Sequence, residues 1–197
     1  MAMMDKREEV RLINRSKRGD SVAIEALIRN HQQALYAFML RMSGRPETAE
    51  DIVQEAFVRV LGNIERFDTR FRFSTWVFTI ARRLYVNAMQ KKRPVYDTDS
   101  LAFRSSGMAT PGGISATGET KANINHILNF ALMDLNDQQR EIILLFHQQD
   151  WSIANIADHL DMPQGTVKSH LHRARKRMRR TITENETLLQ RTEEVWA

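Results

Sequence analysis

The chain of 197 residues contains no cysteine. Disulfide bonds and thiolate metal sites are therefore excluded, and nothing in the composition indicates an oxidising compartment. No apolar run approaches the roughly 20 residues that a membrane-spanning helix needs, and the N-terminal segment lacks the apolar core of a signal peptide. We therefore expect a cytoplasmic protein with no membrane insertion.

The sequence also lacks the common signatures of enzymes and of strands. It contains no P-loop, no GxSxG motif and no paired carboxylates at catalytic spacing, so we predict no catalytic residues and no cofactor. His170 and His172 are two positions apart on an expected helix and point to different faces, and His147 and His159 have no carboxylates at ligand spacing. We therefore predict no metal site. No stretch alternates between apolar and polar residues, which favours an all-α fold.

Positive charge is the main compositional feature. The formal net charge is +5, the sequence pI is about 9.8, and 42% of residues are hydrophobic. A chain of this length has room for one domain or two small ones with compact cores. The charge favours an acidic partner such as nucleic acid, and the clustering of the charge matters more than its sum.

Apolar residues at spacings of three and four predict helices over the first half of the chain. We expect residues 1–19 to be a basic N-terminal segment and residues 20–93 to form a first helical domain. Asp20 or Ser21 suits the N-cap of its first helix, and its third helix is expected to begin at about Thr75.

The second half of the chain changes in composition twice. Residues 94–120 hold half of the eight glycines and two of the four prolines, which predicts a flexible linker. Residues 121–182 again show helical periodicity and predict a second helical domain. Asp137 and Ser152 are expected N-caps within it. The acidic tail, residues 183–197, is expected to be a frayed helix.

A dense basic helix is predicted near the end of the second domain. Residues 164–180 read QGTVKSHLHRARKRMRR, with seven Lys or Arg residues and no acid. Four residues form one apolar stripe at helical spacing: Val167, Leu171, Ala174 and Met178. Polar and cationic side chains then occupy the opposite side. Such a helix can pack on its own domain while it meets phosphates and base edges in a DNA groove.

Aromatic residues alternate with arginines in an expected loop of the first domain. Residues 66–74 read RFDTRFRFS. A base that leaves the DNA stack needs an aromatic or apolar pocket, hydrogen-bond donors and cationic neighbours. The composition of this loop suits that task. For Phe73 and for Trp76, which opens the next helix, we favour a place in the core.

Two motifs together resemble one family. The segment SIANIADHLDMPQGTVKSHLHRAR resembles the helix-turn-helix of bacterial RNA polymerase sigma factors, and AEDIVQEAFVRVL followed by FSTWVFTIARR resembles the conserved core region of the same family. Two such blocks without a large middle domain match the extracytoplasmic-function (ECF) subclass. The resemblance covers about residues 20–93 and 121–181, and it implies a region 2-like and a region 4-like helical domain.

The resemblance implies a function and a set of site residues. Such a factor binds core RNA polymerase, recognises the −35 and −10 promoter elements and promotes DNA melting. The residues implied at the −35 element are Thr166, Lys168, Ser169, His172, Arg173, Arg175 and Lys176. The residues implied at the single-stranded −10 element are Phe67, Asp68, Arg70, Phe71, Arg72, Trp76 and Arg83. The residues implied to contact a coiled coil of the largest polymerase subunit are Asp51, Gln54, Glu55 and Arg59.

The chain departs from the family pattern at a few positions. Arg83 stands where many members have an asparagine that lines the base pocket, and residues 87–90 replace a usual D-x-x-R, so the preferred −10 base is open. His170 replaces a usual arginine, and Leu135-Asn136 replaces a Leu-Pro turn. The family also commonly has an anti-sigma factor as a partner, although no residue here identifies one.

Three other classes of protein remain as alternatives. A helix-turn-helix repressor or activator would use the first domain to sense a ligand or to dimerise, but it has no need for a loop that holds unpaired bases. An adaptor or anti-sigma protein would leave seven clustered cations without a role. RNA binding is compatible with the charge, whereas a helix-turn-helix favours duplex DNA.

Overall fold

The computed structural model describes residues 5–92 and 116–184, with side chains described for 5–91 and 125–184. These residues form helices and connecting turns, and the ranges just given contain no strand, in agreement with the predicted all-α fold. The chain divides into two compact units, residues 1–104 and 105–197. Within the described ranges, no helix combines the length and apolar character that crossing a bilayer requires.

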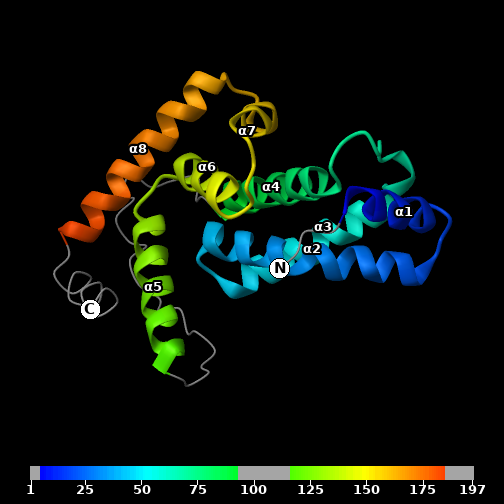
Figure 1. Ribbon diagram of the computed structural model, residues 1–197, viewed down its shortest axis with the longest axis horizontal. Coiled ribbons are helices and arrows are strands. Elements are labelled where there is room, and N and C mark those ends of the chain that lie inside the picture. The colour runs from blue at the N-terminus through cyan, green and yellow to red at the C-terminus, as the bar shows by residue number, and fades with distance from the viewer. Residues whose placement is uncertain (1–4, 93–115, 185–197) are drawn as a thin grey trace. The chain divides into compact units, whose positions relative to one another are not determined.

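Over its described residues, 5–92, the first unit contains four α-helices and a short 3-10 turn (Figure 1). Helix α2 packs against α1, α3 and α4, and α3 also packs against α4. The core of this unit is formed by apolar side chains from every helix, with Leu27, Leu35, Phe38, Val60 and Phe78 almost fully buried. The bounds of these elements are α1 Lys6–Ser16, α2 Ser21–Ser43, α3 Pro46–Gly62, η1 Ile64–Arg66 and α4 Phe73–Lys92.

Local signals explain where α2 begins and ends. The carboxylate of Asp20 accepts hydrogen bonds from the backbone N–H groups of Val22 and Ala23, so Asp20 is the N-cap and Ser21, the other predicted candidate, is the first helical residue. Gly44 ends the helix at a φ of 68°, a left-handed conformation that glycine adopts without steric cost. Two residues later Pro46 opens α3 at a position where its missing N–H costs nothing.

Helix α1 was not predicted from the sequence. Residues 1–19 were expected to be a basic segment outside the first domain, but Lys6–Ser16 is a helix that packs on α2. Ile13 is buried at its centre, and His31 of α2 lies 3.3 Å from the carboxylate of Glu9. The acidic first turn and the apolar spacing of Val10 and Ile13 were the signals for this helix.

Between residues 116 and 184, the described part of the second unit, there are four helices: α5 Ala116–Met133, α6 Asp137–His147, α7 Ile153–Leu160 and α8 Gln164–Thr183. Helix α8 packs against the other three. Helix α7, the turn at Asp161 and α8 form the expected helix-turn-helix, in which Asp161 takes a left-handed φ of 51°. Ser152 caps α7 by accepting the N–H of Asn155, as predicted.

Two boundaries in this unit differ from the prediction. The N-cap of α6 is Asn136, whose side-chain oxygen accepts the N–H of Gln139, and Asp137 is the first helical residue. Helix α5 begins at Ala116, so residues 116–120, expected to belong to the linker, are helical. Residues 94–115 of the expected linker and residues 185–197 of the expected tail lie outside the described residues.

A buried guanidinium joins α5 to α6. Arg140 donates to the backbone carbonyls of Leu132 at 2.9 Å and Leu135 at 2.8 Å, and it lies 3.3 Å from Asp137. Helix C-terminal carbonyls lack partners within their own helix. Arg140 donates to one such carbonyl, that of Leu132, and to the carbonyl of Leu135 just beyond α5, and so fixes the turn between the two helices on which α8 packs.

Candidate DNA and polymerase interfaces

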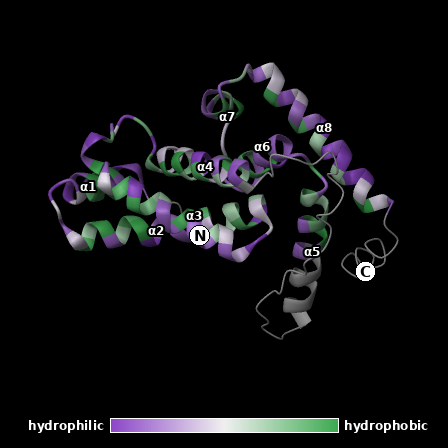
Figure 2. Ribbon diagram, turned by 180° about the vertical axis from the view of Figure 1, so that it is seen from behind, coloured by the Kyte–Doolittle hydropathy of each residue, from purple (hydrophilic) through white to green (hydrophobic). Residues whose placement is uncertain are grey.

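The basic helix α8 has the two sides that its sequence predicts. Val167, Leu171 and Ala174 are buried, and Met178 is half-buried further along the same stripe. Most of the helix is hydrophilic, with short apolar interruptions (Figure 2). The exposed side chains include Lys168, Ser169, His172, Arg173, Arg175 and Lys176. The apolar stripe therefore holds the helix on its unit and leaves the predicted −35 contacts open to solvent.

The first turn of α8 follows directly from the turn of the motif. Pro163 precedes the helix, and its carbonyl accepts the N–H of Thr166 at 2.9 Å. Thr166 is half-buried, and the hydroxyl of Ser169 donates to the carbonyl of Gly165 at 3.0 Å. The donor of Ser169 is thus engaged within the helix, whereas its oxygen can still accept a hydrogen bond from a base.

Two arginines of α8 contact residues elsewhere in the same unit: Arg177 contacts Asp134 in the turn after α5, and Arg175 contacts His147 at the end of α6. Arg177 donates to the carboxylate of Asp134 at 2.9 and 3.2 Å, and Thr181 donates to the same carboxylate at 2.6 Å. The hydrogen bond from Arg177 lowers the pKa of Asp134 and raises that of Arg177. The guanidinium of Arg175 lies 3.1 to 3.3 Å from Nε2 of His147 and 5.3 Å from the ring centre of Phe146.

Two histidines of this unit, His147 and His170, have lowered pKa values. Burial lowers the pKa of His147, and the Arg175 cation lowers it further, while Asp150 opposes the change. Burial, followed by Arg173, also lowers the pKa of His170. Both effects favour the neutral imidazole, because desolvation and a nearby cation penalise a second positive charge. In the described ranges, no group of three or more His, Asp or Glu residues could hold a metal ion.

The arginine-rich loop of the first unit spans residues 67–72, shorter than the predicted 66–74. Arg66 belongs to η1 and Phe73 opens α4, two residues before the expected start. Asp68 accepts hydrogen bonds from the backbone N–H of Arg70 at 2.9 Å and from its Nε at 2.8 Å. The side-chain bond from Arg70, followed by the backbone bond, lowers the pKa of Asp68. The carboxylate therefore folds the loop into a local turn.

The aromatic residues of this loop have opposite environments. Phe67 is buried, stacks on Trp76 with ring centres 4.8 Å apart, and meets Phe73 edge-on at 5.5 Å. Phe73 is fully buried, as predicted, and Trp76 is only half-buried. Phe71 is 65% exposed. Of the predicted base-contacting aromatics, the structure therefore places Phe67 in the core, Trp76 at its edge and Phe71 in solvent.

The cationic members of the predicted −10 site are exposed. Arg70 and Arg72 flank Phe71 on the loop, and Arg83 lies seven residues after Trp76, on the same face of α4. The side chain of Arg70 is ion-paired with Asp68 at 2.6 Å. Phe71 and two neighbouring cations thus form one exposed group, while the half-buried Trp76 and the exposed Arg83 lie about two turns apart along α4.

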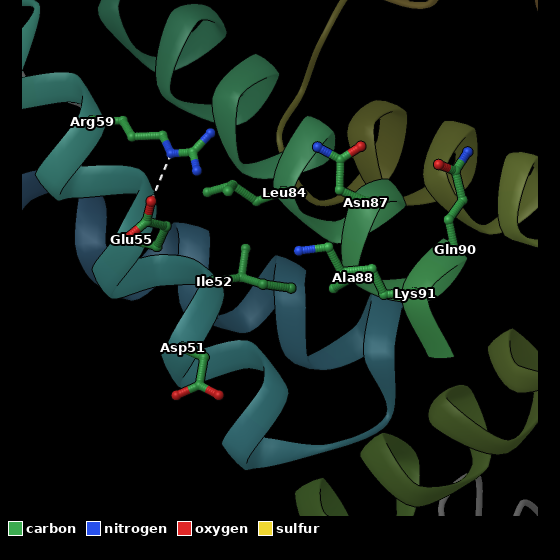
Figure 3. Close-up of a pocket in the computed structure, with 9 residues that line it drawn as sticks. All are labelled: Asp51, Ile52, Glu55, Arg59, Leu84, Asn87, Ala88, Gln90 and Lys91. Carbon is green, nitrogen blue, oxygen red and sulfur yellow. Dashed lines mark hydrogen bonds and ion pairs between the residues drawn. The ribbon is translucent and has the colours of Figure 1, made fainter. Parts of the chain in front are cut away.

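The predicted polymerase-contacting residues occupy the exposed face of α3. Asp51, Gln54, Glu55 and Arg59 are all exposed, and Arg59 donates to Glu55 at 2.7 Å. A groove of about 570 Å³ runs between α3 and α4 beside them. Ile52, Leu84 and Ala88 lie between the two helices (Figure 3). The nine residues that line the groove are Asp51, Ile52, Glu55, Arg59, Leu84, Asn87, Ala88, Gln90 and Lys91.

Several residues of these surfaces were missed from the sequence. The α4 side of the groove includes Asn87, Gln90 and Lys91, which sequence spacing alone could not place opposite α3. Val58, one turn after Gln54 on α3, is 66% exposed. An apolar residue within an otherwise polar strip could have marked it as part of this surface.

Comparisons with known proteins identify the family of the chain. Residues 27–95 match the family described as Sigma-70 region 2, and residues 126–178 match Sigma-70, region 4. The ECF RNA polymerase sigma factor SigW of Bacillus subtilis (strain 168) is 31% identical over 188 residues, covering 92% of this chain and 98% of SigW. The ECF RNA polymerase sigma factor SigL of Mycobacterium tuberculosis (strain H37Rv) is 30% identical, covering 84% of this chain and 92% of SigL.

Two solved structures have the same fold. The sigma factor RpoE of Bartonella quintana, solved with the anti-sigma factor NepR, is 27% identical with a TM-score of 0.64, covering 81% of this chain and 96% of RpoE. CnrH, solved with the cytosolic domain of CnrY, has a TM-score of 0.68 at 19% identity, covering 92% of this chain and 99% of CnrH. The chain belongs to the ECF sigma factors of RNA polymerase. Its function is promoter recognition and transcription initiation with that enzyme.

Proposed function

We propose that the two units divide promoter recognition between them. Helix α8 enters the major groove of the −35 element, with Lys168, Ser169, His172 and Arg173 at base edges. Thr166, Arg175 and Lys176 contact phosphates, since hydroxyl, guanidinium and ammonium groups suit phosphate oxygens. The observation that carries this proposal is the buried stripe of α8, which leaves the cationic side of the helix exposed.

The first unit takes the unpaired −10 strand in this proposal. Phe71 offers an exposed ring on which a base can stack, and Arg72 and Arg83 offer cations for the backbone. Asp68 shapes the loop through its bonds to Arg70. Phe67 acts from the core by supporting Trp76, whose half-exposed ring can contribute a second stacking surface.

The exposed face of α3 is proposed to bind the coiled coil of the largest polymerase subunit. Asp51, Gln54, Glu55 and Arg59 form a polar strip, and the groove beside α4 gives the partner helix a concave surface. The protein contributes binding energy and DNA distortion, and the polymerase performs the chemistry, so the chain itself is not an enzyme. Transcription takes place in the bacterial cytoplasm, and we place the protein there.

A regulatory partner also follows from the family. RpoE of Bartonella quintana was solved with the anti-sigma factor NepR. We expect this chain to have an anti-sigma factor that competes with polymerase or DNA for the exposed surfaces of its helices.

In vitro transcription tests the proposal directly. Purified chain and core polymerase are incubated with genomic DNA, and the start sites of the transcripts are mapped. Start sites that share two sequence elements at fixed spacing would support the proposal and define both elements. Failure to initiate anywhere would contradict it, and binding of duplex DNA by the chain alone without transcription would favour a repressor or activator.

A further inference from the structure

A lysine far away in the sequence holds the first residue of the arginine-rich loop. The ammonium of Lys17, at the C-terminal end of α1, donates to the backbone carbonyl of Phe67 at 2.7 Å. The two residues are fifty positions apart, and the bond is partly buried. Hydrogen bonds with a charged donor are shorter and stronger than neutral ones. Lys17 lies outside residues 27–95, the segment that matches Sigma-70 region 2.

The position of Lys17 is itself well defined. Its backbone N–H bonds to the carbonyl of Ile13, and Arg15 pairs with Asp20 at 2.7 Å across the turn that follows α1. Gly19 supports this turn with a φ of 80°. The turn joins α1 to the N-cap of α2, so the backbone of Lys17 is fixed on the core of the unit by its neighbours on both sides.

Phe67 connects this lysine to the rest of the loop. The Phe67 N–H closes the 3-10 turn on Ile64 at 3.1 Å, while its ring packs on Phe73 and Trp76. The next residue in the chain is Asp68, whose carboxylate accepts hydrogen bonds from Arg70. The Lys17 ammonium also acts on Asp68, since it adds to the lowering of the Asp68 pKa that the bonds from Arg70 chiefly cause.

A second contact, made by His31 of α2, supports the C-terminal end of the loop. The ring of His31 lies 5.1 Å from the ring of Phe73, and the His31 imidazole is 3.3 Å from Glu9 of α1. Helix α1 therefore contacts Phe67 directly through Lys17, whereas Phe73 is contacted by His31 of α2, which in turn lies beside Glu9 of α1. The exposed residues Arg70, Phe71 and Arg72 lie between these two supported positions.

We propose that Lys17 is a positioning residue for base capture: it anchors the Phe67 carbonyl and so sets the geometry in which Phe71 and its flanking arginines meet an unpaired base. This inference rests on the proposed role of the loop at the −10 element. Lys17 acts through the loop backbone and does not itself contact DNA.

Amide hydrogen exchange on the full chain tests the anchoring without any promoter. In K17A, the peptide covering residues 67–73 should exchange roughly tenfold faster, the size expected when one hydrogen bond to a charged donor is lost. K17R keeps a donor and should remain close to the wild type. R18A removes the same charge from the exposed neighbour and should leave the loop unchanged. Exchange in α3 should be the same in all four proteins.

Three results would overturn the proposal in this experiment. The loop of K17A could exchange at the wild-type rate. K17A and R18A could accelerate it equally, which would reduce the effect to net charge. Exchange in α3 could accelerate together with the loop, which would show that Lys17 only stabilises the unit as a whole.

Transcription measures the consequence for recognition. On a promoter mapped with the wild-type chain and core polymerase, each base is placed in turn at the captured position. K17A should lose roughly tenfold in preference for the best base over the worst, and K17R should restore most of it. R18A should keep the preference. Unchanged preference in K17A, or a weaker salt dependence typical of a lost phosphate contact, would overturn the inference. If the wild type fails to initiate transcription, the proposed function is contradicted. Hydrogen exchange would still show whether Lys17 anchors the loop at Phe67.

Discussion

The guanidinium of Arg175 and Nε2 of His147 lie 3.1 to 3.3 Å apart, in a contact between α8 and the last residue of α6. Arginine carries only donors, so the imidazole nitrogen must be unprotonated to accept from it. The same guanidinium lies over the ring of Phe146. The direction in which Arg175 extends from α8 is thus linked to the protonation state of one histidine.

The first prediction concerns the stability of the protein at mildly acid pH. The pKa of His147 is lowered from 6.5 by burial and then by Arg175, so below about pH 6.5 the unfolded chain binds a proton that the folded chain does not. The free energy of unfolding should be unaffected above that pH and should fall as the pH drops through the lowered pKa. H147Q, measured by urea unfolding across this range, should lose less stability than the wild type.

The exposed His172 offers a matched control on α8, since H172Q should keep the wild-type dependence. His170 shifts in the same direction as His147, so part of the dependence should persist in H147Q. An identical pH dependence in H147Q and the wild type would contradict the assignment.

The second prediction concerns base recognition by Arg173, which is exposed on the outer side of α8. If it makes a bidentate base contact, R173A should lower selectivity at one −35 position by about 1–3 kcal/mol. The measurement is competition binding with duplexes that vary one base pair at a time. R179A removes an equal charge further along the helix and should lower affinity without changing selectivity. An R173A variant that discriminates every base as before would refute the assignment.

The third prediction separates phosphate contact from base reading. R175A should weaken binding to all duplexes alike and reduce the salt slope by about 1, because one phosphate contact is lost. H147A keeps the Arg175 charge and should retain the wild-type slope. A wild-type slope in R175A would show that Arg175 meets no phosphate in the wild-type complex.

The fourth prediction concerns the tie between Asp134 and α8. D134A removes the acceptor for Arg177 and Thr181 and should destabilise the second unit by about 0.5–1 kcal/mol, the usual size for a partly exposed ion pair. It should also release Arg177 and steepen the salt dependence of DNA binding. The pKa of Asp134 is lowered from 3.8, chiefly by the bond from Arg177, so this contribution should be present above about pH 4 and lost below it.

The exposed Asp158 on α7 is the control for net charge. D158A removes the same charge from the same unit but leaves the pair with Arg177 intact. Equal effects of D134A and D158A on stability and on salt dependence would contradict a specific role for the pair.

The fifth prediction concerns the buried Arg140. R140M should destabilise the second unit by about 3 kcal/mol, because the buried carbonyls of Leu132 and Leu135 lose a charged donor. Native-state hydrogen exchange of α6 in urea measures this free energy unit by unit. Q138A, at an exposed position of the same helix, should change it little. A loss below about 1 kcal/mol in R140M would mean that water replaces the guanidinium.

Local signals made much of this fold predictable. The cap at Ser152 and the buried stripe of α8 depend on residues only a few positions apart, and the structure has them as predicted, while the cap at Asp20 is one of the two candidates that the sequence offers. Asn136 and Asp137 are neighbouring residues of good capping type, and sequence alone could not choose between them. In the structure Asn136 makes the cap, while Asp137 lies within reach of Arg140.

Long-range contacts account for what the sequence did not reveal. Helix α1 is short, and its helical state depends on burial of Ile13 against α2. In the irregular loop no periodicity distinguishes the buried Phe67 from the exposed Phe71. The bond between Lys17 and Phe67 joins residues fifty positions apart, and no pattern in the sequence marks it.

The turn that Asp68 makes with Arg70 has a kinetic consequence. Because this turn takes its shape when the protein folds, the proposed stacking of an unpaired base on Phe71 would use a surface that needs little further ordering. The rate of capture should therefore follow how often the duplex breathes open, and rearrangement of the protein should contribute little to the delay.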